Sequence, residues 1–274
     1  MDKKTSHFKT SDNISLEVQS FILSDNPEKI ILIVHGLGEH GGRFRGAADF
    51  FNEKGISVCV LTLRGHGDSE GKRGHAPSLE QLLTDIEYFI RFVRVAYLNA
   101  DLYLYGHSMG GNIVLNYLAK DQSDEIKAGI ATSPWIKLAF DPPKWKVVLG
   151  NWAADIIPSL IQPSGLKAED ISSIKEEVEK YETDPLIHDK VSAKLFTSIT
   201  KGGEYLIHNT HKFKHKVFLA HGQQDKIISH DATAEFAKDS NLFTFKSYPK
   251  SKHEIHHDVD FEDLMGDLLE WMGK

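Results

Sequence analysis

Residues 102–120 read LYLYGHSMGGNIVLNYLAK, and this stretch decides the fold. Residues 102–105 are apolar or aromatic and predict a buried strand, whereas residues 112–120 carry apolar side chains at helical spacing. The residues between them, GHSMG at 106–110, fit the pattern G-x-S-x-G. In that pattern a sharp strand-to-helix turn lifts the serine to the edge of a sheet, and the glycines leave room where a Cβ would clash. The stretch therefore predicts that Ser108 is a nucleophile on an α/β sheet.

Apolar runs and helical patterns alternate along most of the remaining chain. Strands are expected at residues 16–23, 30–34, 57–63, 102–105, 126–132, 216–220 and 242–248, and helices at 44–54, 79–97, 112–120, 231–238 and 261–272. Continuously apolar strands separated by helices are typical of a mostly parallel sheet that helices cover on both faces. The predicted fold class is therefore α/β.

The alternation stops between residues 134 and 205, where helical pieces but no strand are expected. We predict an α/β core made of residues 1–133 and 206–274, with a helical cap inserted at 134–205. The cap contains one apolar stripe at helical spacing, formed by Trp145, Val148, Leu149, Trp152, Ile156 and Leu160. We expect this stripe to face the interior. The alternative is that it docks on lipid, helped by Lys137, Lys144 and Lys146.

Composition limits the possible partners. The chain has 274 residues, 41% hydrophobic composition and a formal net charge of −7, which suits one large core and disfavours binding to nucleic acid. Cys59 is the only cysteine, so a disulfide within the chain is impossible, and its apolar surroundings predict a buried side chain. The N-terminal residues lack the apolar segment of a signal peptide, and no apolar run approaches the ~20 residues of a membrane span. We expect a cytoplasmic protein.

A serine hydroxyl needs a base to take its proton and an acid to orient that base. In α/β sheets with this turn the chain order is serine, acid, histidine. Asp225 follows the strand at 216–220, and His253 follows the last strand, so both are expected at the carboxyl edge beside Ser108. Asp184 also lies between Ser108 and His253, but it falls in the insertion, where a capping or ion-pair role suits it better.

The loop after the strand at 30–34 reads HGLGEH and predicts an oxyanion hole. Such a site needs two backbone N–H donors aimed at the developing negative charge. One donor is expected from Met109, the residue after the nucleophile, and the other from Leu37. Gly36 and Gly38 on either side of Leu37 allow the backbone to approach a substrate.

Residues 253–257 read HEIHH and match the zinc-protease pattern H-E-x-x-H. That pattern requires His253 and His257 on one face of a regular helix, whereas the preceding residues and the position after the last strand predict a loop. No third ligand is evident from spacing. We therefore predict no metal and no organic cofactor, and we expect Glu254 and His257 to be solvated or locally hydrogen-bonded.

The combination of HGLGEHGGRF, LRGHGDSEGKRGH, YGHSMGG, SPW, YETDPL, HGQQD and KHEIHHD resembles the monoacylglycerol lipase and lysophospholipase branch of the α/β-hydrolases. The resemblance runs from about residue 30 to the C-terminus. It implies an α/β-hydrolase fold in which Ser108, Asp225 and His253 form the triad. It also implies that Glu39, Arg43 and His256 form a polar pocket for the leaving alcohol, with simple surface exposure of His256 as the alternative.

The resemblance implies a serine carboxylester hydrolase that cleaves monoacylglycerols through an acyl-enzyme. The implied partners are a small lipid substrate and, through a mobile cap, a membrane or micelle surface. The carboxylate of Glu39 disfavours a phosphate head group, whereas Arg43 weakens that preference. A lysophospholipase or general carboxylesterase is the alternative, and a peptidase or a non-catalytic binding protein on the same fold is less favoured.

Overall fold

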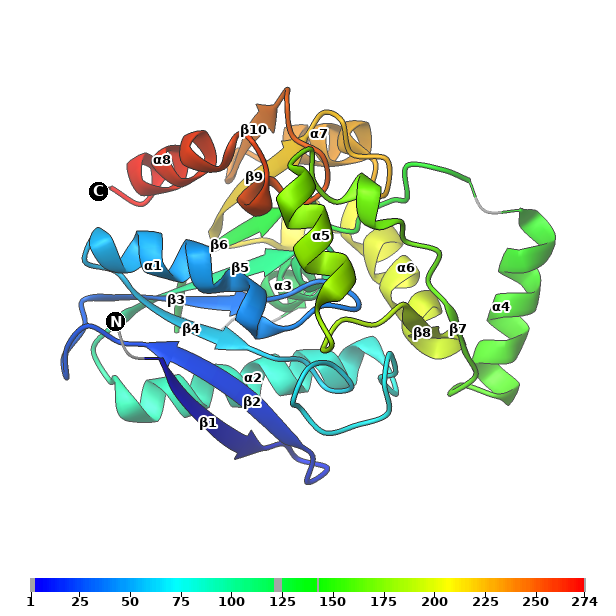
Figure 1. Ribbon diagram of the computed structural model, residues 1–274, viewed down its shortest axis with the longest axis horizontal. Helices are drawn as coiled ribbons and strands as arrows, with labels where there is room; N and C mark the ends of the chain where they lie inside the picture. The colour runs from blue at the N-terminus through cyan, green and yellow to red at the C-terminus, as the bar shows by residue number, and fades with distance from the viewer. Residues whose placement is uncertain (1–2, 121–124, 142, 274) are drawn as a thin grey trace.

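The structure is a computed structural model that describes residues 3–120, 125–141 and 143–273, with the side chains of 144–148 and 151 outside the description. Figure 1 shows a central twisted sheet with helices above and below it. Its strands are β1 (Lys4–Lys9), β2 (Ser15–Phe21), β3 (Lys29–Val34), β4 (Ser57–Leu61), β5 (Asp101–His107), β6 (Ile126–Thr132), β9 (Lys216–Gly222) and β10 (Phe243–Tyr248). The helices are α1 (Arg45–Glu53), α2 (Leu79–Ala96), α3 (Met109–Lys120), α4 (Lys144–Ile156), α5 (Lys175–Thr183), α6 (Ala193–Ile207), α7 (His230–Lys238) and α8 (Phe261–Trp271).

The eight strands have the order β1-β2-β4-β3-β5-β6-β9-β10. β1 and β2 pair antiparallel, β2 also pairs antiparallel with β4, and the pairs from β4 to β10 are parallel. In the parallel part every strand ends at the same edge of the sheet. The loops after β3, β5, β9 and β10 therefore meet at that edge, which is where open α/β sheets place their sites.

Two apolar layers hold the sheet between the helices. On one face, side chains from α1 and α8, such as Phe51 and Leu268, pack on alternate strand residues such as Ile31 and Ile33. The other face is covered by α2, α3, α6 and α7, and its layer includes Leu32 and Ile113. Alternate residues of β3 thus enter opposite layers, as the period of two in a strand requires. Cys59 is buried in β4, as its apolar surroundings predicted.

The structure confirms the expected core elements within a few residues, and it adds three strands that the pattern did not indicate. β1 is missing from the prediction because its sequence, KTSHFK, is polar, and it is largely exposed at the sheet edge. The expectation that residues 134–205 contain no strand is wrong. β7 (Ile161–Pro163) pairs antiparallel with β8 (Lys190–Ser192), but three residues are too short to show a period of two.

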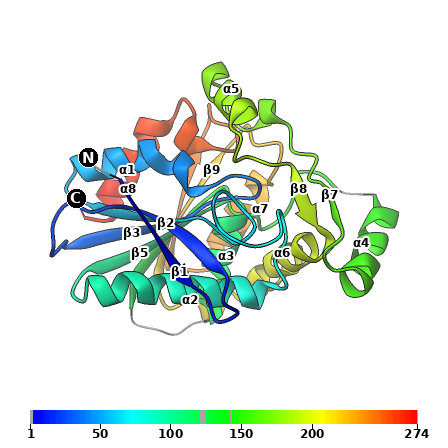
Figure 2. The same ribbon diagram turned by 60° about the horizontal axis from the view of Figure 1, so that its bottom comes forward.

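The segment between β6 and β9 does not form one separate layer. α6 packs on α3 of the core, where the Asn112 side-chain amide donates to the carbonyls of Trp135 and Ile199. α4 in turn packs on α6 through a small buried cluster of Ala153, Ala154 and Ala193. Figure 2 shows α4 at the far end of the molecule from the N-terminus, and α5 above the sheet.

The expected inward orientation of the apolar stripe is wrong for its described members. Trp152 is 58% exposed, and the other exposed large apolar side chains of this region are Phe140, Leu149, Ile156, Ile157 and Leu160. Trp145 and Val148 lie outside the described side chains, as do Lys144 and Lys146. The alanines take the inner face of α4 because their small side chains allow close approach to α6. Within the described ranges, no helix is both long enough and apolar enough to cross a bilayer.

Candidate active site

Ser108 occupies the turn between β5 and α3 in a strained backbone conformation. Its φ angle is +53°, in the left-handed region that residues with a side chain rarely adopt. A Cβ on Gly106 would lie 2.3 Å from the carbonyl oxygen of Gly110, and one on Gly110 would lie 2.2 Å from the carbonyl oxygen of Val34. Both contacts are with backbone, which cannot rotate away. The tight turn therefore requires both glycines and holds the serine hydroxyl at the sheet edge.

His253 lies between the two other residues expected to act together. Its Nε2 is 2.9 Å from Oγ of Ser108, and its Nδ1 is 2.7 Å from Oδ2 of Asp225. Ser133, after β6, donates its hydroxyl to the backbone carbonyl of His253 at 2.7 Å. The structure thus brings together three side chains from the ends of β5, β9 and β10 in one continuous hydrogen-bonded chain.

Burial and charge act in opposite directions on this chain of groups. Burial disfavours the imidazolium form of His253, but the carboxylate of Asp225, helped by those of Glu254 and Glu39, outweighs it, so the pKa of His253 is raised above its ordinary value. Burial likewise disfavours the Asp225 carboxylate, yet His253 and His221 together hold the pKa of Asp225 far below its ordinary value. The arrangement therefore keeps the acid ionised next to a base that can accept a proton.

The two residues expected to supply the oxyanion donors belong to elements that meet near Ser108. Met109 is the first residue of α3, and Leu37 follows the end of β3. Leu37 and Ser108 line the same cavity of about 20 Å³, which has room for a single water molecule. Gly38 has a φ of +83°, and a Cβ there would meet the carbonyl of His188 at 2.4 Å. This glycine lets the HGLG loop pass close beneath the inserted segment.

Glu39 and Arg43, two of the three residues expected to form a polar pocket, belong to a buried charge cluster. Glu39 Oε1 accepts from the amide of Gly36 at 2.6 Å, and its Oε2 accepts from Arg43 Nε at 3.2 Å. Arg43 also forms a close ion pair with Glu254. Burial, followed by the charge of Glu254, raises the pKa of Glu39. Glu39 and Glu254 both line the small cavity at Ser108.

Sequence reasoning missed the two remaining members of this cluster. Glu254 was expected to be solvated or locally hydrogen-bonded. It is not solvated, since its side chain is 4% exposed, and its hydrogen bond is to Arg43, which is distant in sequence. Tyr181 of α5 lies against Arg43, with the guanidinium carbon 5.0 Å from the ring centroid. Glu254 adjoins His253 in sequence, and Tyr181 is the first residue of the motif YETDPL, so the sequence offered a signal for both residues. Only their contacts show what they face.

His256 lies apart from the small cavity. Surface exposure, the alternative considered for it, is wrong because the residue is 4% exposed. Its ring stacks on Phe44 at 4.6 Å and lies 4.6 Å from the His107 ring. Among the described residues neither ring nitrogen finds a hydrogen-bond partner, and burial drives the pKa of His256 well below its ordinary value. The structure therefore places a neutral ring behind the cavity, and its role in binding an alcohol stays a prediction.

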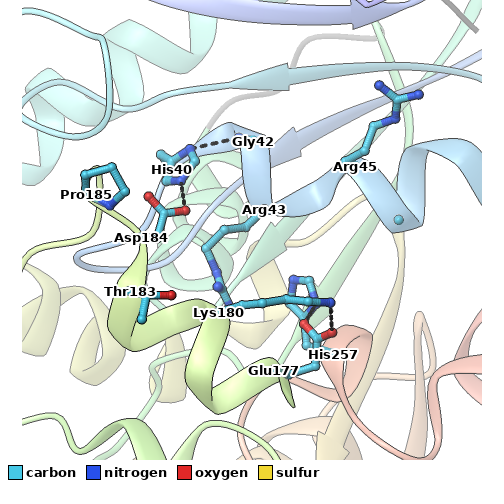
Figure 3. A pocket seen from close by; sticks show the side chains of 11 residues that line it. His40, Gly42, Arg43, Arg45, Glu177, Lys180, Thr183, Asp184, Pro185 and His257 are labelled. Atoms are coloured by element: carbon cyan, nitrogen blue, oxygen red, sulfur yellow. Dashed lines mark hydrogen bonds and ion pairs between the residues drawn. The ribbon is translucent and has the colours of Figure 1, made fainter. Parts of the chain in front are cut away.

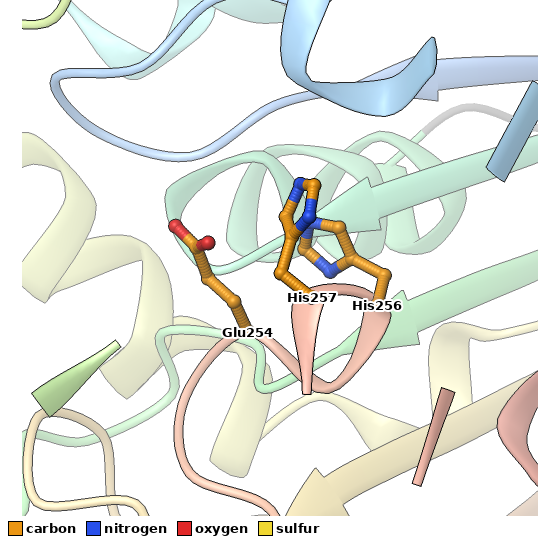
Figure 4. Close-up of side chains that lie close together, drawn as sticks. All are labelled: Glu254, His256 and His257. Carbon is orange, nitrogen blue, oxygen red and sulfur yellow. The ribbon is translucent and has the colours of Figure 1, made fainter. Parts of the chain in front are cut away.

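The H-E-x-x-H match falls in a loop and one short turn. His253 precedes the 3-10 helix η4 (Ile255–His257), so His253 and His257 do not share a regular helix. Ligand atoms of Glu254, His256 and His257 do lie within 4.8 Å of one another (Figure 4). Glu39, His107 and Glu254 form a second such group. Arg43 is paired with the carboxylates of both groups, and its positive charge opposes a cation there.

A larger pocket of about 530 Å³ lies between the start of α1 and α5 (Figure 3). Arg43 lines it from the core, and two ion pairs bridge the core to the inserted segment. His40 Nε2 is 3.0 Å from Asp184, and His257 Nδ1 is 3.1 Å from Glu177. Asp184, the rival candidate for the acid, is thus engaged with His40 and with the amide of Leu186. It serves as an ion-pair and turn residue.

The sequence profile of the family Hydrolase_4, described as serine aminopeptidase, S33, matches residues 25–260. The chain belongs to this family. An abhydrolase domain-containing protein of Dictyostelium discoideum is 32% identical over 275 aligned positions, which cover 99% of this chain and 29% of that protein. This Hydrolase_4 chain thus spans less than a third of the length of that relative.

Two further proteins resemble this chain over most of their length. A monoacylglycerol lipase of Mycolicibacterium smegmatis is 26% identical, with 90% of this chain and 89% of that protein covered. The crystal structure of Paleococcus ferrophilus monoacylglycerol lipase has a TM-score of 0.83 at 28% identity and covers 99% of this chain and 98% of that one. The fold is therefore the expected α/β-hydrolase fold.

Proposed function

We propose that this protein is a serine carboxylester hydrolase that cleaves monoacylglycerols to fatty acid and glycerol. The observation that carries the proposal is the hydrogen-bonded chain Ser108–His253–Asp225 at the carboxyl edge of the sheet. A hydroxyl in contact with a buried imidazole, itself oriented by an ionised carboxylate, is the arrangement that makes serine nucleophilic. The similarity to two monoacylglycerol lipases supports the substrate class.

The reaction follows from these contacts. Nε2 of His253 takes the proton of Ser108 as its Oγ attacks the ester carbonyl, and Asp225 stabilises the imidazolium that forms. The amides of Leu37 and Met109 are proposed to hold the oxyanion of the tetrahedral intermediate. His253 then protonates the leaving glycerol oxygen. A water molecule repeats the sequence on the acyl-enzyme and releases the fatty acid, with no metal or organic cofactor required.

The polar groups around the cavity favour an uncharged leaving alcohol. Glu39 and Glu254 line the cavity, and both carboxylates share the one guanidinium of Arg43. A phosphate head group would place further negative charge beside this pair, which is costly at short range in a buried site. Glycerol hydroxyls, by contrast, can donate to these carboxylates. This balance favours a monoacylglycerol over a lysophospholipid.

Entry of such a substrate requires movement of the segment above the site. The cavity at Ser108 holds about 20 Å³, far less than an acyl chain occupies. We propose that residues 134–205 act as a cap over the core and that they shift to admit the ester. The exposed apolar side chains of α4, such as Trp152 and Ile156, suit a transient contact with a membrane or micelle from which the substrate is drawn.

The experiment is labelling with a fluorophosphonate probe combined with turnover of a substrate panel. Wild type is expected to be labelled and to hydrolyse monoacylglycerol faster than lysophosphatidylcholine or short p-nitrophenyl esters. Ser108→Ala removes the nucleophile and is expected to abolish labelling and to lower kcat by about 10⁵-fold or more. Ser11→Ala, at an exposed turn serine, is the matched control and is expected to behave as wild type.

Retained turnover in Ser108→Ala would refute serine catalysis. Faster cleavage of lysophosphatidylcholine than of monoacylglycerol would leave the chemistry intact but overturn the proposed substrate.

A further inference from the structure

One oxygen of Asp225 is shared by two histidines. Oδ2 lies 2.7 Å from His253 Nδ1 and 3.0 Å from His221 Nε2. The other oxygen, Oδ1, accepts from the backbone amides of Ile227 at 2.8 Å and Ile228 at 3.0 Å. An ionised carboxylate only accepts, so both imidazole nitrogens that face it must carry a hydrogen. Asp225 therefore receives four N–H groups, and the mechanism above uses only one of them.

His221 is held in the tautomer that this contact needs. It lies in β9, is fully buried, and its Nδ1 is 2.9 Å from the Thr233 hydroxyl of α7. Thr233 can donate to Nδ1 while His221 Nε2–H points at Asp225. Burial lowers the pKa of His221, so the ring stays neutral beside the carboxylate. A neutral, fixed donor of this kind adds a hydrogen bond without adding a competing positive charge.

We infer that His221 is a positioning residue that acts through Asp225: its N–H takes up part of the negative charge that the carboxylate presents to His253. The inference rests on the proposed function, in which Asp225 stabilises the imidazolium of His253. The two N–H groups share the same acceptor oxygen. The hydrogen bond from His221 therefore weakens the hydrogen bond that Oδ2 accepts from His253, and the reverse is also true. Without His221, the whole of that oxygen is available to His253, and the imidazolium is stabilised more strongly.

Other charged or titratable groups face His253, and they are unchanged by a substitution at His221. The His107 ring of β5 lies 4.9 Å away, and the carboxylates of Glu39 and Glu254 also favour the protonated form. On the far side, the ring of His230 lies 5.6 Å from that of His221 but hydrogen-bonds to Ser247. His230 is therefore a matched control, a neighbouring histidine that does not bond to Asp225.

The test is the pH profile of kcat/KM for His221→Phe, which keeps a ring but removes the N–H. Activity requires neutral His253, so it falls as pH drops through the pKa of that residue. We expect the midpoint of this fall to move upward by about one pH unit, so that activity below the midpoint is about tenfold lower. Well above both midpoints the variant approaches wild type. His221→Gln, whose amide nitrogen can reach the same oxygen, is expected to restore the midpoint, and His230→Phe to leave it unchanged.

A merely structural role predicts a loss of similar size at every pH, and that result, or a midpoint unchanged in His221→Phe, would overturn the inference. If His221→Phe does not fold, Thr233→Val is used in its place, because without the Thr233 hydroxyl the His221 tautomer is no longer fixed. A smaller upward shift of the midpoint is then expected. No shift would refute the inference. NMR titration of the His253 ring gives the same midpoint without turnover. Failure of wild type to hydrolyse any ester would refute the proposed function, whereas the NMR midpoint would still test the inference about His221.

Discussion

Replacing Arg43 by methionine tests the buried charge cluster beside the candidate nucleophile. The side chains of Glu39, Arg43 and Glu254 are 3%, 5% and 4% exposed, so all three charges are largely shielded from water. Breaking a buried ion pair by removing one partner costs about 3–5 kcal/mol, because the remaining charge is left uncompensated. We expect Arg43→Met to lower the free energy of unfolding by that amount at pH 8.

The same argument predicts how the loss depends on pH. The pKa of Glu39 is already raised with Arg43 present, and it rises further without it. A carboxyl whose pKa is higher in the folded than in the unfolded protein contributes most stability below its unfolded pKa and loses it as pH rises through the folded pKa. The difference between Arg43→Met and wild type should therefore shrink by about 1–2 kcal/mol between pH 8 and pH 5.

Urea unfolding at both pH values measures the effect. Arg45→Met is the matched control, because the Arg45 side chain is 47% exposed and its pair with Asp49 lies at the surface, where such pairs contribute about 0–1 kcal/mol. Adding Glu254→Gln to Arg43→Met should restore part of the lost stability. A loss below 1 kcal/mol, or the same loss at pH 5 and pH 8, would refute the view that Arg43 compensates two buried carboxylates.

Three further predictions concern the site. Because Asp225 raises the pKa of His253, kcat/KM should fall with decreasing pH around a midpoint above the ordinary histidine value of about 6.5; a midpoint below 6 would contradict that balance. Gly106→Ala should abolish probe labelling, because its Cβ would lie 2.3 Å from a carbonyl oxygen. Gly46→Ala is the control: open space surrounds that position, so stability should change by no more than about 1 kcal/mol. Equal behaviour of the two variants would count against the tight turn. Treatment with EDTA should leave turnover unchanged, and loss of activity that zinc restores would show that a metal takes part.

The elements that sequence reasoning found best are those with strong local patterns. β3 and β4 are continuously apolar because helices cover both of their faces, and α2 shows an apolar stripe over most of its length. β1 carries no such signal, since its polar residues lie at the edge of the sheet. β7 and β8 depend on pairing with each other, and a contact between residues so far apart leaves no mark in a short window of sequence.

Ser108, Asp225 and His253 could be selected from the sequence because chain order and strand ends limit where such residues can stand. Their meeting within hydrogen-bond distance, the second imidazole on Asp225, and the burial of Glu254 needed the folded chain. The exposed face of α4 makes the same point, because an apolar stripe reveals amphipathicity but not which neighbour, if any, covers it.

The sequence by itself determined the α/β architecture, the glycines of the turn at Ser108 and the candidates for the catalytic residues. These features depend on local sterics and periodicity, which act over a few neighbouring residues. Only the tertiary structure decided which charges compensate one another, which nitrogen faces which oxygen, and how little space remains above the serine. Those properties depend on distances between segments far apart in sequence, 145 residues for Ser108 and His253 and 211 for Arg43 and Glu254, and burial then makes each such contact strong.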